Sequence, residues 1–428
     1  MAAETSDFRI LGLNQWQQVL LGMILGIIAG ILIKTQAAPE NIAVIAERFR
    51  TIGSIFFNLI KMVIAPLIFF ALISGITSMS DPNTFKRIGV KAVSAYFMTA
   101  MFAVVLGIAF GLIFQPGVGM DIDVSSLASA LPDAAKNSHE MHIGEFLMSL
   151  IPTNFFKALS EDQYLQIVVF SIFTGLIMNS LGDNAKGARD VINSFAKVFF
   201  KMIELIVRLA PLAIFGFMAW MVAVQGVDVI QKLAILFVCV LAACFTQYII
   251  FGVLIILFAR LSPMPFFKKM ASTQIMAFST SSSKATLSTA MREIQERCGV
   301  SEKSANFVLP LGACINMDGT AIYLGICAMF FAQAFGVELS WTAYPILILT
   351  CTLGSIGAAG IPSGSIIFMG MVLHSIGVPI EGIGLILGID RLLDMVRTTI
   401  NITGDCAITM IVDKSENLMD VEKYYSKD

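Results

Sequence analysis

The chain has 428 residues, of which 57% are hydrophobic and only 14% are charged, and its mean hydropathy is +0.82. Because soluble domains carry about 25% charged residues, this composition excludes a soluble globular protein and indicates a polytopic membrane protein. The net charge of −2 does not point to a nucleic-acid partner. The seven cysteines are scattered without a Cys-x-x-Cys pair, which is typical of reduced packing residues and not of a disulfide or metal framework.

Long apolar runs predict membrane spans in the part of the chain before Arg260, since a span needs about 20 apolar residues. The starting stretch MAAETSDFRILGLNQ is polar, so we expect no cleavable signal there. Gly22, Gly26 and Gly30 recur every four residues in the first run, a spacing that lets another helix approach closely, although such glycines can also face lipid by chance. The stretch 143–182 is interrupted by PTNFFKALSEDQ and is predicted to be a broken span. The clear candidates are roughly 16–33, 52–78, 89–114, 193–224 and 229–259.

After Arg260 the apolar runs become short and contain many Ser, Gly, Pro and Asp residues. Two segments, 262–293 and 342–377, each place two short apolar arms around a polar centre, STSSSK in the first and GSIGAAGIPSGS in the second. Neither arm is long enough to cross a membrane, so we predict two re-entrant helical hairpins. Broken backbone at membrane depth is tolerated where it lines a cavity, and two interrupted segments in corresponding places indicate a transporter site. Ordinary kinked spans or loops remain the alternative.

Basic residues predict the orientation of the chain, because they concentrate in cytoplasmic loops. An eight-span count places the basic clusters on one side together with both termini, and it places the acidic loop 117–145 on the other. The first hairpin would then open from the cytoplasm and the second from outside, as an inverted repeat requires. The basic residues are Lys86, Arg87, Lys91, Lys186, Arg189, Arg260, Lys268, Lys269, Arg292, Arg297 and Lys303.

The last span, GIGLILGIDRLLDMVRTTINITGDCAITMIV, carries an unusual set of polar residues. At 100° per residue its polar side chains share an arc of about 100° on one helix face. Charges within spans are rare and mark ion or substrate pathways. An ion-pair ladder between Asp394 and Arg397 is the structural alternative, but it leaves Asn401 and Asp405 unexplained. The set comprises Asp390, Asp394, Arg397, Thr398, Asn401 and Asp405, with Arg391 at its edge.

The residue types predict what this face binds. Arg397 can hold a carboxylate through two parallel hydrogen bonds, and Asp394 one turn away can hold an ammonium, so the pair suits a zwitterion with a second carboxylate. Asp318 and Asp405 offer hard oxygen ligands for a monovalent cation, together with amides and with carbonyls freed where helices break. The segment NMDGT, 316–320, lies between two apolar runs and is predicted to be such a break.

The sequence does not favour an enzyme. It has three histidines, two of them in the acidic loop, so no histidine-based metal site or triad is credible. STSSSK lacks the spacing of a phosphate-binding loop, and no catalytic partners accompany it as a Ser-x-x-Lys motif. A channel or a signalling receptor is the rival from another functional class, and it would need no carboxylate-binding arginine.

Four motifs occur in the order typical of one family: AFSTSSSKATL, NMDGTAIY, SIGAAGIPSGS and GIDRLLDMVRTTINITGD. The chain resembles the glutamate transporter family, the dicarboxylate/amino acid:cation symporters, which include archaeal sodium–aspartate transporters and human excitatory amino acid transporters. The resemblance implies an all-α homotrimer of the cell (inner or plasma) membrane, with eight spans, two opposed re-entrant hairpins, inverted repeats and elevator-type alternating access. It implies a scaffold of residues 1–88 and 118–225, a transport domain of 89–117 and 226–415, and a cytoplasmic tail of 416–428.

The resemblance also implies which ligands are transported and which residues bind them. L-aspartate or L-glutamate would be imported with two to three sodium ions. The substrate would contact Ser281, Ser282, Ser283, Thr320, Ile361, Pro362, Ser363, Gly364, Ser365, Asp394, Arg397, Thr398 and Asn401. One sodium ion would bind Asp405 and carbonyls of Gly312, Asn316 and Asn401. A second would bind carbonyls of Cys314, Ser355, Ile356 and Ala358 near Met317, and a third would bind Asn316, Asp318, Tyr96 and Thr99.

The chain departs from the family pattern near Asp394. Relatives place an arginine beside this acid, at the positions that Ser281 and Met395 occupy here. Lys284 is the nearest replacement in the sequence. Ala100 replaces a second small hydroxyl next to Thr99, which weakens the prediction of the third sodium site.

Two rivals share the fold. Proton-coupled C4-dicarboxylate carriers lack the acid matching Asp394 and have an amide at the position of Asp405, and neutral exchangers lack the arginine matching Arg397. Leu324 replaces the acid that human glutamate carriers have after NMDGTAxY, so proton cotransport through that position is not expected. The choice between aspartate and glutamate stays open.

Overall fold

The computed structural model describes residues 15–77, 86–120, 148, 151–161, 163–226, 228–358, 364–378 and 380–426. Within these ranges the secondary structure is helical, which confirms the predicted all-α class. Most of the predicted acidic loop 117–145 lies outside the described residues. The first half contains α1 (Gln15–Gln36), α2 (Pro39–Thr77), α3 (Lys86–Phe114), α5 (Phe155–Ser160), α6 (Tyr164–Ser180), η4 (Gly182–Ala185), α7 (Lys186–Val207), α8 (Ala210–Gln225), α9 (Asp228–Leu254) and the π-helical turn η5 (Ile255–Ala259).

The second half contains mostly shorter helices, followed by the long α17. They are α10 (Pro263–Lys269), α11 (Ala271–Thr280), α12 (Ser283–Glu296), α13 (Glu302–Ile315), α14 (Asp318–Ala334), α15 (Ala343–Gly357), α16 (Gly364–Ser375), η6 (Ile380–Leu385), α17 (Leu387–Ser415) and α18 (Val421–Tyr425). The helix α11 packs on α12, and α15 packs on α16, as the two predicted hairpins require. That these pairs enter and leave a membrane on one side stays a prediction.

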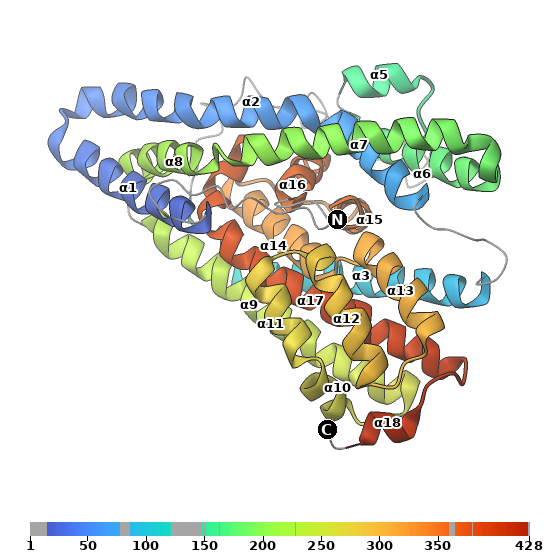
Figure 1. The fold of residues 1–428 in the computed structure, drawn as a ribbon. Coiled ribbons are helices and arrows are strands. Elements are labelled where there is room, and N and C mark those ends of the chain that lie inside the picture. Colours follow the sequence, from blue (N-terminus) through green and yellow to red (C-terminus); the bar gives the residue numbers. More distant parts are fainter. Residues whose placement is uncertain are drawn as a thin grey trace.

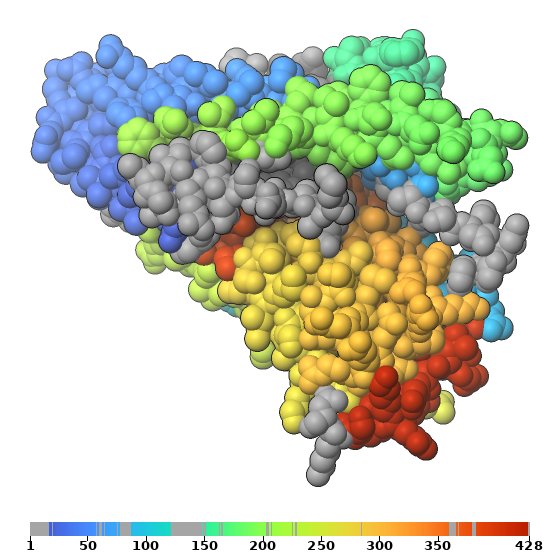
Figure 2. Space-filling model, in the orientation of Figure 1, coloured from blue at the N-terminus to red at the C-terminus, as the bar shows by residue number. Residues whose placement is uncertain are grey.

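The helices form two groups (Figure 1). In one, α2 packs against α6, α7 and α8, and α1 packs against α8. In the other, α17 packs against α9, α11, α13 and α14, while α3 packs along α14. Figure 2 shows the yellow and orange surface of α11, α12 and α13 beneath the green α7. The roles of scaffold and transport domain for these groups stay predictions.

The glycines of the first span face another helix, as their spacing predicts. A Cβ atom at Gly22 would lie 2.4 Å from the Pro211 carbonyl oxygen, and one at Gly26 would lie 2.6 Å from the Phe215 carbonyl oxygen. A Cβ atom at Gly30 would lie 2.8 Å from the carbonyl oxygen of Ala219. All three contacts are to α8, so the glycines allow the α1 and α8 backbones to approach closely.

The predicted single span 193–224 is wrong, because the structure divides it. The helix α7 ends at Val207 and α8 begins at Ala210, with Pro211 in its first turn. Proline has no N–H and its ring clashes with a preceding helical turn, so it starts a helix more easily than it continues one. The predicted interruption of 143–182 is confirmed, since α5 and α6 are separate helices.

Three helical stretches are long and apolar enough to cross a membrane by length and composition: Arg87–Phe114, Val229–Ala259 and Glu302–Ala334. Shorter apolar helices cover Leu20–Gln36, Ala65–Ser74, Gln166–Ser180, Ala210–Val224 and Ala343–Gly357. These findings hold for the described residues. They agree with a multi-pass membrane protein, and the count of eight spans stays a prediction.

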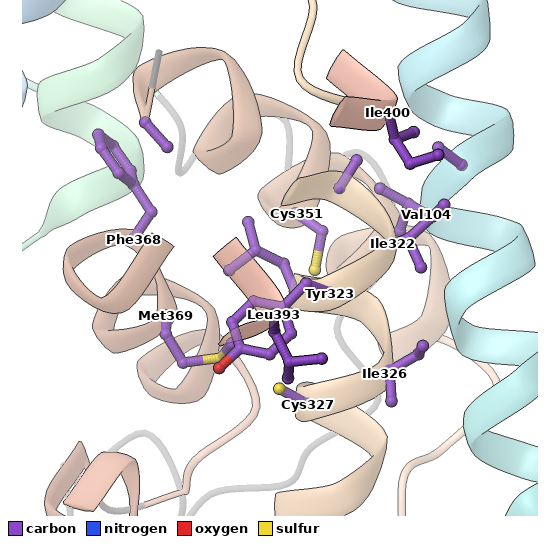
Figure 3. Packing of buried hydrophobic residues seen from close by; sticks show 14 of the residues in the cluster. Val104, Ile322, Tyr323, Ile326, Cys327, Cys351, Phe368, Met369, Leu393 and Ile400 are labelled. Carbon is purple, nitrogen blue, oxygen red and sulfur yellow. The ribbon is translucent and has the colours of Figure 1, made fainter. Parts of the chain in front are cut away.

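The core of the second group surrounds α14, whose residues are almost all buried. Figure 3 shows Ile322, Tyr323, Ile326 and Cys327 of α14 among side chains from neighbouring helices. The neighbours labelled there are Val104 of α3, Cys351 of α15, Phe368 and Met369 of α16, and Leu393 and Ile400 of α17. All seven cysteines carry free thiols. The apolar packing therefore fixes α14 between the helices that bear the polar residues.

The C-terminal helix α18 closes the base of the first hairpin. The Tyr424 hydroxyl donates to the Ser262 carbonyl at 2.6 Å and accepts from the Phe266 N–H at 3.2 Å. It thereby caps α10, which has no side-chain cap of its own. The buried Lys269 ammonium donates to the carbonyls of Arg297 (2.8 Å) and Lys423 (2.9 Å). The end of the chain is therefore bound to α10 and to the end of α12.

Basic residues at the start of α3 meet the end of α17. Lys91 Nζ donates to Glu416 Oε1 at 2.6 Å and to the Ser415 hydroxyl at 3.0 Å, and Arg87 pairs with the other oxygen of Glu416. Together with Lys269 and Arg297, these cations cluster near the C-terminal segment, as a shared side of the membrane would require. Which side of a membrane they occupy stays a prediction.

Candidate functional site

The segment NMDGT interrupts a helix, as predicted. The helix α13 ends at Ile315, Asn316 is extended (φ −102°, ψ 102°), and α14 begins at Asp318. A helix end leaves backbone N–H groups without intrahelical partners, and here the Gly319 N–H donates to Asn401 Oδ1 on α17 at 2.8 Å. The break therefore brings backbone and side-chain polar groups of two helices together inside the protein.

Arg397 is the central charge of α17 and is fully buried. Its Nη1 donates to Asp390 Oδ1 at 2.9 Å, and its Nη2 donates to Asp394 Oδ1 and to the Ser365 hydroxyl, both at 3.0 Å. Its guanidinium carbon lies 4.0 Å from the centre of the Tyr323 ring. The arginine is therefore held by residues from α14, α16 and α17, and the ion pair predicted as the structural alternative is present.

Asp394 has a second cationic neighbour. Arg391 Nη1 lies 3.6 Å from Asp394 Oδ2, one turn earlier on α17. Arg391 and Arg397 both face this acid. The sequence singled out Lys284 for this role, but the Lys284 side chain lies outside the described part of the structure.

Asp405 and Asn316 lie together. Asn316 Nδ2 donates to Asp405 Oδ1 at 2.9 Å, and Asp405 Oδ2 is buried without a hydrogen-bond partner. A Cβ atom at Gly312 would lie 2.6 Å from Asp405 Oδ1, so a side chain there would displace the Asp405 carboxylate. Asn401, one turn before Asp405 on α17, contacts Met317, with its Nδ2 lying 3.0 Å from Met317 Sδ.

A second acid lies nearby at the start of α14. Asp318 is fully buried, and its Oδ2 accepts from Gln247 Nε2 on α9 at 3.1 Å while its Oδ1 has no partner. Thr99 Oγ1 lies 3.4 Å from Asn316 Oδ1, and the Tyr96 hydroxyl lies 3.5 Å from the Asp405 carbonyl oxygen. The structure thus brings the residues predicted for the first and third sodium sites into one buried network.

This network fits a monovalent cation better than a transition metal. Among the described residues, no group of three or more His, Cys, Asp and Glu side chains is arranged to hold a metal ion. The network offers two carboxylates, each with one unpartnered oxygen, alongside amide, hydroxyl and carbonyl oxygens. A buried anionic oxygen without a partner is costly, and a hard cation with oxygen ligands would compensate it.

The tip of the first hairpin consists of three serines. Ser281 has a left-handed backbone (φ 50°), and its hydroxyl is buried without a partner. The Ser282 hydroxyl accepts from the Ala285 N–H at 3.2 Å and caps α12. Ser283 is buried at the first position of α12. The buried hydroxyl of Ser281, next to the N-terminus of α12, suits a ligand with acidic groups.

The structure describes only some of the remaining residues that were predicted to bind substrate or sodium. Ile361, Pro362 and Ser363 lie outside the described residues, and Gly364 begins α16. Thr320 and Thr398 are buried on α14 and α17. Ser355, Ile356 and Ala358, predicted for the second sodium site, lie at the end of α15, which packs against the α13 helix that carries Cys314.

Sequence reasoning missed three contacts of the site. Asp390 was recognised on the polar face but was not assigned a partner, and Tyr323 and Gln247 were not singled out. Tyr323 follows the NMDGT break by one helical turn, and Gln247 is an amide within the apolar run LAACFTQYIIFG. An amide in a membrane span was the available signal for Gln247.

Residues 16–415 match the sodium:dicarboxylate symporter family. The chain belongs to this family. It is 32% identical over 414 residues to the proton/glutamate-aspartate symporter of Escherichia coli (strain K12), covering 95% of this chain and 94% of the relative. It is 30% identical over 410 residues to the proton/sodium-glutamate symport protein of Bacillus subtilis (strain 168), covering 95% and 94%.

A third relative has another type of substrate in its name. The C4-dicarboxylate transport protein of Rhizobium leguminosarum is 32% identical over 415 residues, covering 94% of this chain and 89% of the relative. Membership of the sodium:dicarboxylate symporter family makes the chain a membrane transporter and not an enzyme. The resemblance stated from the four motifs is thereby confirmed.

Proposed function

We propose that the chain is a secondary active symporter that imports L-aspartate, L-glutamate or both, driven by sodium ions. The observation that carries this proposal is the adjacency of two kinds of site. The buried Arg397 and the partly buried Asp394 lie on the same helix face as Asp405, whose unpartnered oxygen suits a cation.

The substrate's distal carboxylate would bind Arg397, because a planar guanidinium holds a carboxylate with two parallel hydrogen bonds. Its ammonium would bind Asp394. The tip serines, Thr320, Thr398 and Asn401 would hold the remaining polar groups. Arg397 now contacts Asp390, Asp394 and Ser365, so the substrate carboxylate would replace some of these contacts.

Sodium would bind where the protein leaves carboxylate oxygens unpaired. The Asp405 site includes carbonyls of Gly312, Asn316 and Asn401, and the Asp318 site includes Tyr96 and Thr99. Together with the site near Met317 at the end of α15, these two sites would bind two to three sodium ions per transport cycle. Alternating access by an elevator movement, a homotrimeric scaffold and cytoplasmic termini belong to the same proposal.

Proton-coupled transport of a C4-dicarboxylate is the second candidate. It is favoured by the names of two relatives and by the same unpaired oxygens, since a buried carboxyl without a cation would hold a proton. Asp394 weighs against it, because a dicarboxylate without an amino group gives this acid no ammonium to bind.

The test is uptake of radiolabelled substrate into liposomes that contain the purified protein, with sodium, proton and potassium gradients imposed singly. We expect a sodium gradient alone to drive aspartate or glutamate accumulation. Succinate should not compete at equal concentration. Accumulation of succinate driven by a proton gradient, without sodium, would establish the second candidate instead. Liposomes without protein give the leak, and uptake without any gradient gives passive equilibration.

A further inference from the structure

Gln247 on α9 is a buried amide that contacts a proposed cation ligand. It is fully buried, and its Nε2 donates to Asp318 Oδ2 at 3.1 Å across 71 residues of sequence. One turn later, Phe251 packs at the same place, since a Cβ atom on Gly404 would lie 2.8 Å from Phe251 Cζ and 3.0 Å from Asn316 Nδ2. This face of α9 therefore borders the network of Asn316 and Asp318.

The amide oxygen of Gln247 has no hydrogen-bond partner. Its Oε1 is buried without a hydrogen bond, as is Oδ1 of the Asp318 carboxylate that it contacts. Burying a carbonyl or carboxylate oxygen without a partner is unfavourable, and both oxygens carry this penalty. Both penalties disappear when a hard cation binds the two oxygens.

Gln333 on α14 provides a comparison, because both ends of its side-chain amide are hydrogen-bonded, as expected of a purely structural role. Its Oε1 accepts from the Gly117 N–H at 3.1 Å, and its Nε2 donates to the Gly111 carbonyl at 3.0 Å. Both ends of that side chain are satisfied by the backbone around α3. Gln247 differs because only its donor end is used and its partner is an acid.

We propose that Gln247 belongs to the cation site at Asp318, a role that rests on the sodium coupling proposed above. Its N–H group orients the Asp318 carboxylate, and its amide oxygen adds a ligand from α9 to those from α3 and from the break between α13 and α14. The site would then join three separate helical segments of the second group of helices, and sodium binding would draw them together.

The test is sodium binding without substrate, measured on purified full-length protein by equilibrium binding of radiolabelled sodium. Replacing an outer ligand or an orienting partner typically weakens cation affinity about 10- to 100-fold, so Gln247→Met should shift the sodium titration by this factor. Saturating sodium should restore most of the aspartate binding of Gln247→Met. Gln333→Met is the matched control, which should lower the melting temperature without moving the sodium titration.

The outcomes separate the two proposals. A wild type whose aspartate binding ignores sodium would overturn the proposed coupling, whatever Gln247 does. A sodium-dependent wild type together with a Gln247→Met titration within twofold of it would overturn the role of Gln247 alone. If Gln247→Met does not fold, Gln247→Asn keeps an amide but shortens its reach to Asp318, and it should weaken sodium binding in the same direction. An unchanged titration of that variant would equally overturn the role.

Discussion

Arg397 and Asp394 lie one turn apart on α17, and the arginine Nη2 donates to the aspartate Oδ1 at 3.0 Å. Asp390 accepts from the same guanidinium at 2.9 Å, and Arg391 lies 3.6 Å from Asp394. Two cations and two anions are therefore in contact within the eight residues 390–397. An arriving carboxylate must compete with acids of the protein for Arg397, and removing either partner leaves a buried charge uncompensated.

Arg397→Cys should abolish uptake of acidic amino acids, because only their distal carboxylate requires the guanidinium. Breaking a buried charge pair typically costs about 3–5 kcal/mol, enough to remove measurable aspartate binding. Neutral amino acids would then be admitted, since Asp394 and Asn401 still hold the amino-acid backbone. The measurement is competition by acidic and neutral amino acids for binding to the purified variant.

Arg391→Cys is the control for that substitution. Arg391 is partly exposed and makes a longer contact to Asp394, so the variant should keep acidic selectivity. An aspartate affinity of Arg397→Cys within about threefold of the wild type would sink the assignment of Arg397 to the distal carboxylate.

Asp405→Asn should weaken substrate binding at low sodium and recover at high sodium. Asparagine has nearly the same size, so packing is kept while one anionic oxygen is lost. Binding of linked ligands is reciprocal, with usual coupling factors of about 5- to 150-fold, and the apparent substrate constant should rise within this range. Substrate titrations at several sodium concentrations and two pH values measure the effect.

Asp413→Asn on the same helix is its matched control. Asp413 is also fully buried, but both of its oxygens are occupied by the N–H and hydroxyl of Ser301. That variant should lose stability without changing the sodium dependence. If Asp405→Asn and Asp413→Asn shift the sodium dependence alike, the effect reflects damage to α17 and the cation site is misplaced.

Gly26→Ala should destabilise the packing of α1 on α8. The new Cβ atom would meet the Phe215 carbonyl oxygen at 2.6 Å, and overpacking of this kind costs about 1–3 kcal/mol. Gly187→Ala on α7 meets no atom within 4 Å and should stabilise by about 0.4–1 kcal/mol. Thermal unfolding of both variants in one detergent compares them. Equal melting temperatures would show that the glycine face is not needed for this contact.

Glu416→Gln tests the link between α3 and the end of α17. The hydrogen bond from Lys91, together with Arg87, holds the pKa of Glu416 below its ordinary value of 4.5. The stability from this pair is therefore fully present above pH 4.5 and is lost as the pH falls through the lowered pKa. The melting temperature of Glu416→Gln should lie below that of the wild type at neutral pH, and the difference should shrink in acid.

Glu161→Gln removes the acid of an exposed pair with Lys157 at 3.8 Å and serves as the control. Its melting temperature should equal that of the wild type at every pH, since exposed pairs contribute little. A difference between Glu416→Gln and the wild type that grows in acid would contradict the expected sign.

The sequence predicted the features that follow from local rules. The polar face of α17, the break at Asn316 and the glycine face of α1 each depend on periodicity or on residue types within a few positions. The division between α7 and α8 was missed because the run 193–224 is mostly apolar, although Arg208 and Pro211 mark the break. Gln247 was missed because its contact with Asp318 joins residues of two helices, which periodicity within one helix does not reveal.

The cap on α10 has a consequence for biosynthesis. Phe266 donates to a tyrosine hydroxyl that follows it by 158 residues. A ribosome adds about 5–20 residues per second, so α10 is made on the order of ten seconds before Tyr424 exists. Throughout that interval the first hairpin has an uncapped base. Synthesis of α18, and not that of α10 itself, is therefore the step that completes this cap.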